Sequence, residues 1–379
     1  PQNGQLVAST DRLPRRVAVF QAAPDTPDIL VTYDVVSVLT PEVAAVASII
    51  APAGLQPTLD GSVAGSLAPG FDTTATYRVM PVIRDFSDPN ALDTQTVEAI
   101  IGNRQLRDSH IQQLLSLTNT SGFDGLFIDY RGLPAEQRQN FTAFIEALSA
   151  SLRSNGRLLG VVVPVAENVA GTWETSAYDW QALGAASDYL SINLRLNPDD
   201  YLPGETQFVE ALLRWTTTQV DRYKVLLGFT ASSVREIADT YTTIGYDESL
   251  AGLGDVVVEA DTTEAGTLNP GSEIRAYLDG RDAIAGVDTR TNAPFIDYLD
   301  NDGNATARIW LTTGDALRYR MDRTIPFALG GVAFGDLLAS DLASDVLPTI
   351  SRYQAQIPSA PSPTRLALRW RATGSLRSG

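Results

Sequence analysis

The segment of residues 122–134 carries side chains whose types and spacing could do chemistry. It reads Gly-Phe-Asp-Gly-Leu-Phe-Ile-Asp-Tyr-Arg-Gly-Leu-Pro, and Phe127, Asp129 and Arg131 alternate along its apolar run. Such alternation in a β-strand places the three side chains on one face. A carboxylate and a guanidinium two residues apart on one face can form a charge-assisted pair. The segment therefore predicts a polar site at the end of a buried strand.

Short apolar runs elsewhere in the chain predict the strands that position this site. They are rich in Val, Ile, Leu and Phe, and most are near-continuous, which is typical of parallel strands covered on both faces. The runs occupy residues 77–83, 125–130, 158–164, 189–194, 225–229 and 331–334, with 46–51 as a second strand. Two segments, 17–21 and 29–33, both qualify as the first strand.

Helical patterns lie between these runs. Residues 134–152 place apolar side chains on one helical face, and 208–220 and 315–321 are similar. Alternating strands and helices over this length predict an α/β fold, a (β/α)8 TIM barrel. In such a barrel Phe127, Asp129 and Arg131 point inward, and Arg131 falls at the carboxyl end, where active sites lie.

One stretch, residues 231–309, is too long for a connection between the seventh and eighth strands. Residues 256–259, 273–277 and 295–298 read as short strands, and 300–303 (Asp-Asn-Asp-Gly) as a hairpin turn. We therefore predict a small α+β insertion. The predicted organisation is 1–45 as an N-terminal segment and barrel start, 46–230 barrel, 231–309 insertion, 310–356 barrel end, and 357–379 linker with a further module.

Composition excludes several classes of function. The formal net charge of −17 over 379 residues opposes binding to nucleic acid and to anionic lipid. The chain has no cysteine and one histidine, His110, which we expect on the solvated face of a helix. Disulfides and zinc–sulfur sites are therefore excluded, and we expect neither a metal site nor a cofactor. No apolar run is long enough to insert into a membrane.

The termini suggest a part of a longer precursor. The chain starts at Pro1 rather than at a methionine, and residues 357–364 read Ile-Pro-Ser-Ala-Pro-Ser-Pro-Thr, a stiff linker. Residues 366–370 alternate like the first strand of another module. A tail that packs back on the domain is an equal alternative.

The segment 122–134 resembles the fourth strand of glycoside hydrolase family 18, especially its spore-cortex and cell-wall N-acetylglucosaminidase branch. That family carries D-G-x-x-x-D-x-E, usually with an acidic residue at the middle x. Asp124, Gly125 and Asp129 match the pattern, whereas Phe127 replaces the middle acidic residue and Arg131 replaces the glutamate. Further segments, at 79–83, 178–188, 224–228, 295–310 and 329–333, resemble the family in the same order, so the resemblance spans roughly residues 46–350.

The resemblance implies a mechanism that this chain lacks a group to perform. In the family the glutamate protonates the glycosidic oxygen, while the aspartate orients the N-acetyl group that attacks the anomeric carbon. Arginine stays protonated and cannot act as a general acid. The family's acetamido tyrosine is also missing from 192–196 (Ile-Asn-Leu-Arg-Leu), and Gly335 and Asp336 stand where its sugar-stacking tryptophan is expected. Together these departures indicate a degenerate site.

Several residues remain candidates for a role in binding or catalysis. We favour a structural pair between Asp129 and Arg131, with anion binding by Arg131 and Arg195 as the alternative. The candidate ligand-binding residues are Asp129, Arg131, Asn193, Arg195 and Trp173, and the candidate substitute acids are Asp85 and Asp336.

Three hypotheses of function follow. The favoured one is a family 18-like pseudo-enzyme outside a bacterial cell, which binds cell-wall glycan or other surface proteins as a module of a larger protein. The second is an active N-acetylglucosaminidase or peptidoglycan hydrolase with a replaced acid. The third is a structural subunit of a surface layer or filament. Fold alone does not decide among them.

Overall fold

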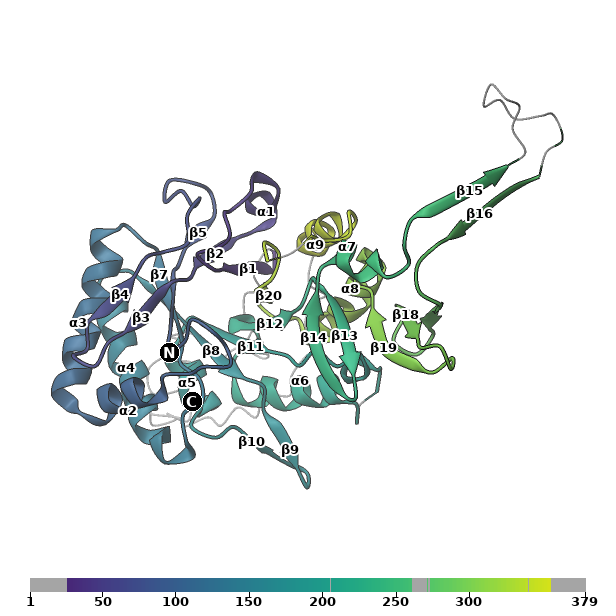
Figure 1. Cartoon of the computed structure of the whole chain (residues 1–379). Helices are drawn as coiled ribbons and strands as arrows, with labels where there is room; N and C mark the ends of the chain where they lie inside the picture. Colours follow the sequence, from purple (N-terminus) through teal and green to yellow (C-terminus); the bar gives the residue numbers. More distant parts are fainter. Residues whose placement is uncertain (1–25, 205, 261–270, 272, 340, 356–379) are drawn as a thin grey trace, which may run out of the picture.

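A closed barrel of parallel strands forms the body of the molecule. The computed structural model describes residues 26–204, 206–260, 271, 273–339 and 341–355 (Figure 1). Around the ring the strands are β1 (Asp28–Tyr33), β2 (Ile49–Pro52), β5 (Arg78–Val79) with β6 (Val82–Arg84), β7 (Gly125–Asp129), β8 (Leu158–Pro164), β11 (Tyr189–Asn193), β12 (Val225–Phe229) and β20 (Gly331–Phe334). Neighbours pair in parallel, and β20 pairs with both β12 and β1. The predicted (β/α)8 barrel is confirmed.

The third strand of the barrel is split into two short strands, β5 and β6, and each of them pairs with one neighbour in the ring. β5 pairs with β2, and β6 pairs with β7. Pro81 lies between the halves and has no amide hydrogen for a strand ladder. The predicted strand over 77–83 is therefore correct in place but interrupted.

The first two strands refine the sequence predictions. Residues 29–33 lie in β1, while 17–21 fall outside the described residues. The second strand starts at Ile49 and not at residue 46, because Val46 ends helix α1 (Pro41–Val46). The side chain of Thr40 caps that helix by accepting the backbone N–H of Val43.

Helices surround the strands (Figure 1). They are α2 (Thr94–Gly102), α3 (Arg104–Thr120), α4 (Arg138–Arg153), α5 (Trp180–Ala186), α6 (Phe208–Gln219), α8 (Gly314–Met321) and α9 (Val346–Gln354), with short 3-10 turns η1 (Ala135–Gln137), η2 (Pro198–Tyr201), η3 (Arg222–Lys224) and η4 (Asp322–Phe327). The apolar face predicted for residues 134–152 is confirmed: Phe141, Phe144, Ile145, Leu148 and Leu152 are fully buried in α4. Burying this face between helix and sheet is the main source of its stability.

The chain between β12 and β20 forms a separate antiparallel sheet, in agreement with the predicted insertion. Its order is β14 (Thr240–Ile244), β13 (Ser233–Ile237), β19 (Ala305–Trp310), β18 (Ala293–Leu299) and β17 (Ala283–Asp288), accompanied by α7 (Tyr246–Ala251). The turn at 300–303 joins β18 to β19, as predicted. A separate ribbon of β15 (Val256–Ala260) and β16 (Ile274–Leu278) projects away from this sheet (Figure 1). Two short hairpins complete the fold: β3 (Leu55–Pro57) with β4 (Val63–Gly65), and β9 (Glu167–Val169) with β10 (Thr172–Glu174).

The domain boundaries remain predictions, and two of the predicted segments cannot be placed. The linker at 357–364 and the strand at 366–370 lie outside the described residues. Across the part of the chain that the structure describes, no helix combines the length and the apolar character that a membrane crossing needs.

His110 is buried and not solvated, so that prediction was wrong. It lies on the inner face of α3, where Nδ1 is 2.9 Å from the carbonyl oxygen of Gly61 and Nε2 is 2.7 Å from the hydroxyl oxygen of Tyr130. Because a carbonyl only accepts, Nδ1 carries the hydrogen and Nε2 accepts from Tyr130. Burial lowers the pKa of His110, so the ring stays neutral in the folded state.

A pH dependence of stability follows from this buried ring. The unfolded chain takes up a proton on His110 below about pH 6.5, whereas the folded chain does so only at lower pH. We therefore expect the free energy of unfolding to fall as the pH drops from about 6.5 to the lowered folded pKa. Urea unfolding of the wild type and His110→Gln at several pH values measures this. Their difference should shrink toward acid, and a constant difference would contradict the prediction.

Candidate functional site

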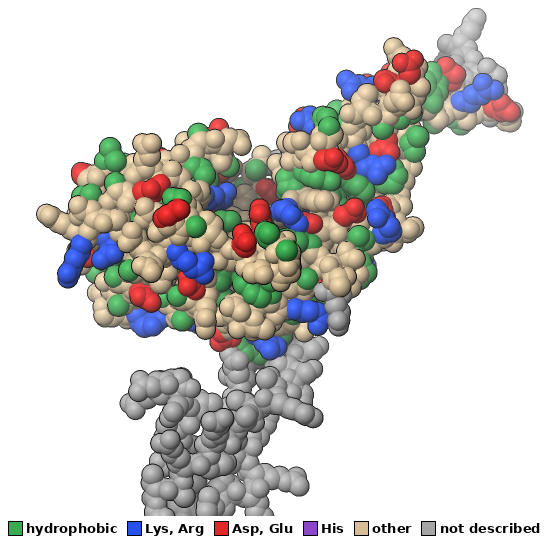
Figure 2. Space-filling model, turned by 90° about the horizontal axis from the view of Figure 1, so that it is seen from below, with side chains coloured by type: hydrophobic (Ala, Val, Ile, Leu, Met, Phe, Trp, Pro, Cys, Tyr) green, Lys and Arg blue, Asp and Glu red, His purple; other side chains and the backbone are tan. Residues whose placement is uncertain are grey.

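A cavity of about 280 Å³ opens at the carboxyl ends of the barrel strands. Its lining comes from the ends of β1, β6, β7, β8, β11, β12 and β20, and Thr243 of the insertion contributes as well. The space-filling view shows a hollow between barrel and insertion with acidic and basic side chains beside it (Figure 2). This is the end of a barrel at which catalytic and binding residues occur.

Asp129 and Arg131 both line the cavity, and the predicted pair between them is confirmed. Arg131 donates from Nε to Oδ1 of Asp129 and from Nη2 to Oδ2, both at 2.8 Å. The Asp129 side chain is 3% exposed and that of Arg131 29%. The guanidinium also lies 4.4 Å above the ring of Phe86. Burial opposes the charge on Arg131, but the Asp129 carboxylate outweighs it and raises the Arg131 pKa.

Arg84 is a site residue that the sequence reasoning missed. It pairs in register with Asp129 across β6 and β7, and its Nε lies 3.5 Å from Oδ2 of that carboxylate. It also makes an ion pair with Asp34 at 2.5 Å. The alternation of Val82 and Arg84 toward the lumen was the available signal, because both line the cavity. Asp129 is thus held between two guanidinium groups.

Asp336 lines the cavity, but its carboxylate is occupied by protein. It accepts the backbone N–H groups of Ala231 at 3.0 Å and Ser232 at 2.9 Å, together with the hydroxyl of Thr230. These donors belong to the turn that follows β12. The side chain therefore serves as an anchor for the start of the insertion.

Asp85 lies behind the wall and is absent from the cavity lining. It is buried, and its Oδ1 accepts the backbone N–H of Arg131 at 2.9 Å, while its Oδ2 has no hydrogen-bond partner. Burial raises the pKa of Asp85 to about 6. That value would suit a general acid, but the group does not face the space in which a substrate would lie.

The raised pKa of Asp85 predicts a stability effect with a defined sign. Above pH 6 the folded state holds an unfavourable buried charge, and this cost disappears as the pH falls from about 6 toward 3.8. Asp85→Asn keeps the acceptor for Arg131 and should raise the free energy of unfolding at pH 7.5 by about 2 kcal/mol. Urea unfolding at pH 7.5 and 4.5 tests this. A gain that is equal at both pH values would contradict it.

Of the other three predicted ligand-binding residues, the structure places one in the cavity wall and two outside it. Asn193 lines the cavity, but Arg195 and Trp173 do not. Arg195 donates to both oxygens of Asp200 at 3.0 Å and lies 3.8 Å above the ring of Phe208. Arg195 is held by Asp200 and does not line the cavity, because β11 ends at Asn193 and the strand alternation ends with it.

Trp173 is packed against protein. It stacks on Trp215 with ring centroids 5.6 Å apart and an interplanar angle of 21°, and it contacts Phe208 at 5.9 Å. This aromatic cluster covers α6 on the outside of the barrel rather than the cavity. The structure therefore gives no support to sugar stacking by Trp173.

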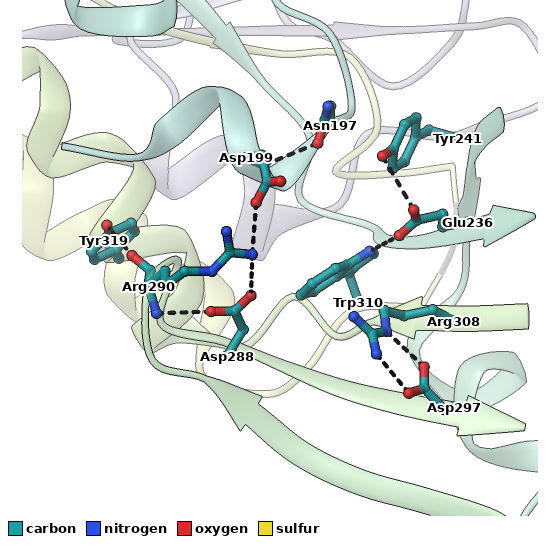
Figure 3. Close-up of polar contacts among 10 residues, drawn as sticks. All are labelled: Asn197, Asp199, Glu236, Tyr241, Asp288, Arg290, Asp297, Arg308, Trp310 and Tyr319. Atoms are coloured by element: carbon teal, nitrogen blue, oxygen red, sulfur yellow. Dashed lines mark hydrogen bonds and ion pairs between the residues drawn. The ribbon is translucent and has the colours of Figure 1, made fainter. Parts of the chain in front are cut away.

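A polar cluster connects the insertion to the loop after β11 (Figure 3). Arg290 contacts Asp199 at 3.3 Å and Asp288 at 2.9 Å, so it joins η2 to the insertion sheet. Trp310 donates from Nε1 to Glu236 at 2.7 Å within that sheet. Trp310 packs in a buried apolar cluster of the insertion, and Leu196 of the cavity wall packs against the same cluster.

Solved structures that share this architecture include one named as a chitinase and one named as a spore cortex-lytic enzyme. A chitinase from Chromobacterium violaceum aligns with a TM-score of 0.64 and 18% identity, over 87% of this chain and 99% of that one. The spore cortex-lytic enzyme SleL of Bacillus megaterium aligns with a TM-score of 0.61 and 14% identity, over 91% and 78%. The chain is a structural relative of chitinases and of spore cortex-lytic enzymes. This confirms, at the level of fold, the resemblance to glycoside hydrolase family 18.

Sequence comparison also finds a relative whose name is that of a glycosylase. The curated "Putative sporulation-specific glycosylase YdhD" of Bacillus subtilis is 25% identical over 179 residues. That match covers 45% of this chain and 42% of the relative, so the chain spans less than half the length of YdhD. No family model matches the chain. The family 18-like barrel is therefore established by structure more firmly than by sequence.

Proposed function

We propose that this chain is a family 18-like barrel that has lost hydrolysis and binds cell-wall glycan at the barrel mouth. In this proposal it is a module of a larger protein on the bacterial surface or outside the cell. The names of its structural relatives, chitinases and spore cortex-lytic enzymes, support a glycan as the ligand. The observation that supports the loss of hydrolysis is the ion pair between Asp129 and Arg131.

The bidentate contact of Arg131 with Asp129 fills the place of the family's proton donor. Glycoside hydrolysis of this type needs a group that protonates the leaving oxygen. Arg131 cannot release its proton near neutral pH, and the pairing strengthens its hold on that proton. Its two hydrogen bonds also occupy both oxygens of Asp129, which would otherwise orient the substrate's N-acetyl group.

The remaining carboxylates near the cavity do not replace the lost acid. Among the residues lining the cavity, the acidic ones are Asp129 and Asp336, and both are bound by protein donors. Asp85 has the raised pKa but does not line the cavity. Hydrolysis by a substituted acid would require Asp85 to reach the cavity.

The cavity has side chains that can bind a sugar even though it lacks a catalytic acid. Asn193, Ser191 and Thr32 give the cavity neutral hydrogen-bonding groups, and Phe229 and Phe334 give it apolar surface. A mostly apolar concave site with a few convergent polar groups is the usual form of a small-molecule pocket. Sugar hydroxyls would pair with the polar groups and the sugar faces would pack on the apolar ones.

The experiment combines pulldown on insoluble peptidoglycan and chitin with a hydrolysis assay on labelled N-acetylglucosamine oligomers. We expect binding without turnover. Gly335→Phe should abolish binding, because Gly335 lines the cavity and a Cβ there meets no atom within 4 Å, so the ring can fill the mouth. Gly102→Phe is the matched control, since Gly102 has equally open space at the end of α2.

Each other outcome is decisive. Turnover would contradict the loss of hydrolysis, and Asp85→Asn and Asp336→Asn would then identify the acid. Binding that Gly335→Phe leaves intact would remove the barrel mouth as the site. If the chain shows no binding and no turnover, the glycan-binding function is rejected and a purely structural module is favoured.

A further inference from the structure

The ribbon of β15 and β16, which we call the arm, has one face that is apolar throughout. In the antiparallel register Val256 lies opposite Leu278, and Val258 lies opposite Ala276. Side chains alternate between the two faces of a ribbon, so these four residues share a face with Ile274. We call this set the apolar face: Val256, Val258, Ile274, Ala276 and Leu278.

The apolar face lies open to solvent. Val256 is 68% exposed, Val258 60%, Ile274 56% and Leu278 50%. The opposite face is different in chemistry, since Glu259 pairs in register with Arg275 and accepts a hydrogen bond from the Tyr277 hydroxyl at 3.0 Å. The arm is therefore amphipathic, like one layer of a two-layer sheet whose second layer is not part of this chain's described residues.

The base of the arm fixes its direction. Gly280 donates its N–H to Leu253 at 3.0 Å, and Arg281 donates to Gly252 at 2.8 Å. A Cβ on Gly280 would lie 2.1 Å from the carbonyl carbon of Leu253, so only glycine permits this close crossing. The arm leaves the body at this crossing and does not fold back on it (Figure 1). An isolated two-stranded ribbon is only marginally stable in water, so a covering layer would stabilise it.

The distribution of charge favours the apolar face of the arm as the place where a second copy of the chain can pack. The whole chain carries a net charge of −17, which opposes contact between two bodies. The strands of the arm carry one acidic and one basic residue, Glu259 and Arg275, and both lie on the polar face. The apolar face itself carries no charge, so two copies can meet on it without bringing like charges into direct contact.

We propose that the apolar face of the arm packs against the same face of a second copy. A twofold axis perpendicular to the strands sets the two arms antiparallel, with Val258 over Val258 and Ala276 over Ala276, and keeps the acidic bodies at opposite ends. The alternative twofold axis, along the strands, would bring the bodies side by side. The contact is isologous and closes as a dimer. It is independent of the proposed glycan binding.

The expected strength of this contact is modest. Five side chains from each copy form an interface smaller than the standard size of about 800 Å² per partner. We therefore expect reversible dimers with a dissociation constant in roughly the micromolar range. Added NaCl should preserve or strengthen the dimer, because it screens the repulsion between acidic bodies and leaves apolar contacts intact.

Sedimentation velocity of the full chain over a concentration series tests the proposal with two matched substitutions. Val258→Asp places a charge on the apolar face and should raise the dissociation constant at least tenfold. Val257→Asp makes the same change one residue away on the polar face and should change it less than threefold. A wild type that stays monomeric at high concentration would overturn the proposal, as would equal effects of the two variants.

A cross-linking experiment tests the geometry. The chain has no cysteine, so each introduced thiol is unique. Ala276→Cys should give covalent dimers with a short bis-maleimide, whereas Arg275→Cys, on the other face, should not. Circular dichroism confirms that each variant is folded. Dimers that cross-link equally from both positions would show a different interface.

Discussion

Replacing Arg131 by methionine should lower the free energy of unfolding by about 3 kcal/mol, because it leaves a buried carboxylate without its bidentate partner. The Asp129 side chain is almost fully enclosed, and Arg84, at 3.5 Å, is the nearest remaining cation. Methionine keeps much of the apolar stem that packs on Phe86, so the loss reports mainly on the charge. Chemical denaturation at pH 7 measures it.

Arg195 offers a matched control for this substitution. It makes an equivalent bidentate contact with Asp200, but its side chain is more exposed than that of Arg131. Arg195→Met should therefore cost about 1 kcal/mol. A double variant, Asp129→Leu with Arg131→Met, removes both charges and should recover most of the stability lost by the single change. Equal losses for the two arginine variants would contradict a special role for the pair in the barrel mouth.

Phe127→Asp should cost more than about 4 kcal/mol, and it is the second large effect that we expect. This substitution puts back the acidic residue of the family motif. In this chain, however, position 127 is fully buried in an apolar layer of the barrel, and its ring stacks on Tyr189 at 6.1 Å. Gly160 leaves the space for that ring, since a Cβ there would lie 2.1 Å from it. A carboxylate at this position would be buried among apolar side chains.

Phe127→Leu provides the control, because it keeps the apolar character and should cost about 1 kcal/mol. Thermal unfolding followed by circular dichroism compares the two variants. If Phe127→Asp folds with near wild-type stability, the layer below the cavity is more polar than the structure indicates. The barrel would then tolerate the acidic residue that family 18 usually carries at this position.

The fold could be predicted from the sequence because its signals are local. Near-continuous apolar runs mark the barrel strands, and the apolar face of α4 needs only helical periodicity. Asp129 and Arg131 could be paired for the same reason, since two residues on one strand share a face. The length of residues 231–309 alone predicted an insertion, and the structure has one.

The failures involve contacts between segments distant in sequence. The buried His110 ring donates a hydrogen bond to the backbone carbonyl of Gly61, 49 residues away, and no periodicity in the sequence indicates that contact. Arg84 reaches Asp129 only through the register of β6 with β7. The contact of Arg195 with Asp200 could not be predicted, because the direction of Arg195 depends on the residue at which β11 ends, and strand ends are set by tertiary packing rather than by local preference.

The carboxylate of Asp336 fastens the exit from β12 to the exit from β20. A second contact joins the start of the insertion to its end, because Thr312, which follows β19, donates from its hydroxyl to the carbonyl oxygen of Ser232 at 2.7 Å. The two chain crossings that carry the insertion are therefore locked to each other and to the barrel rim. An insertion held in this way resists swinging over the cavity like a lid, so we expect the width of the barrel mouth to change little when a ligand binds.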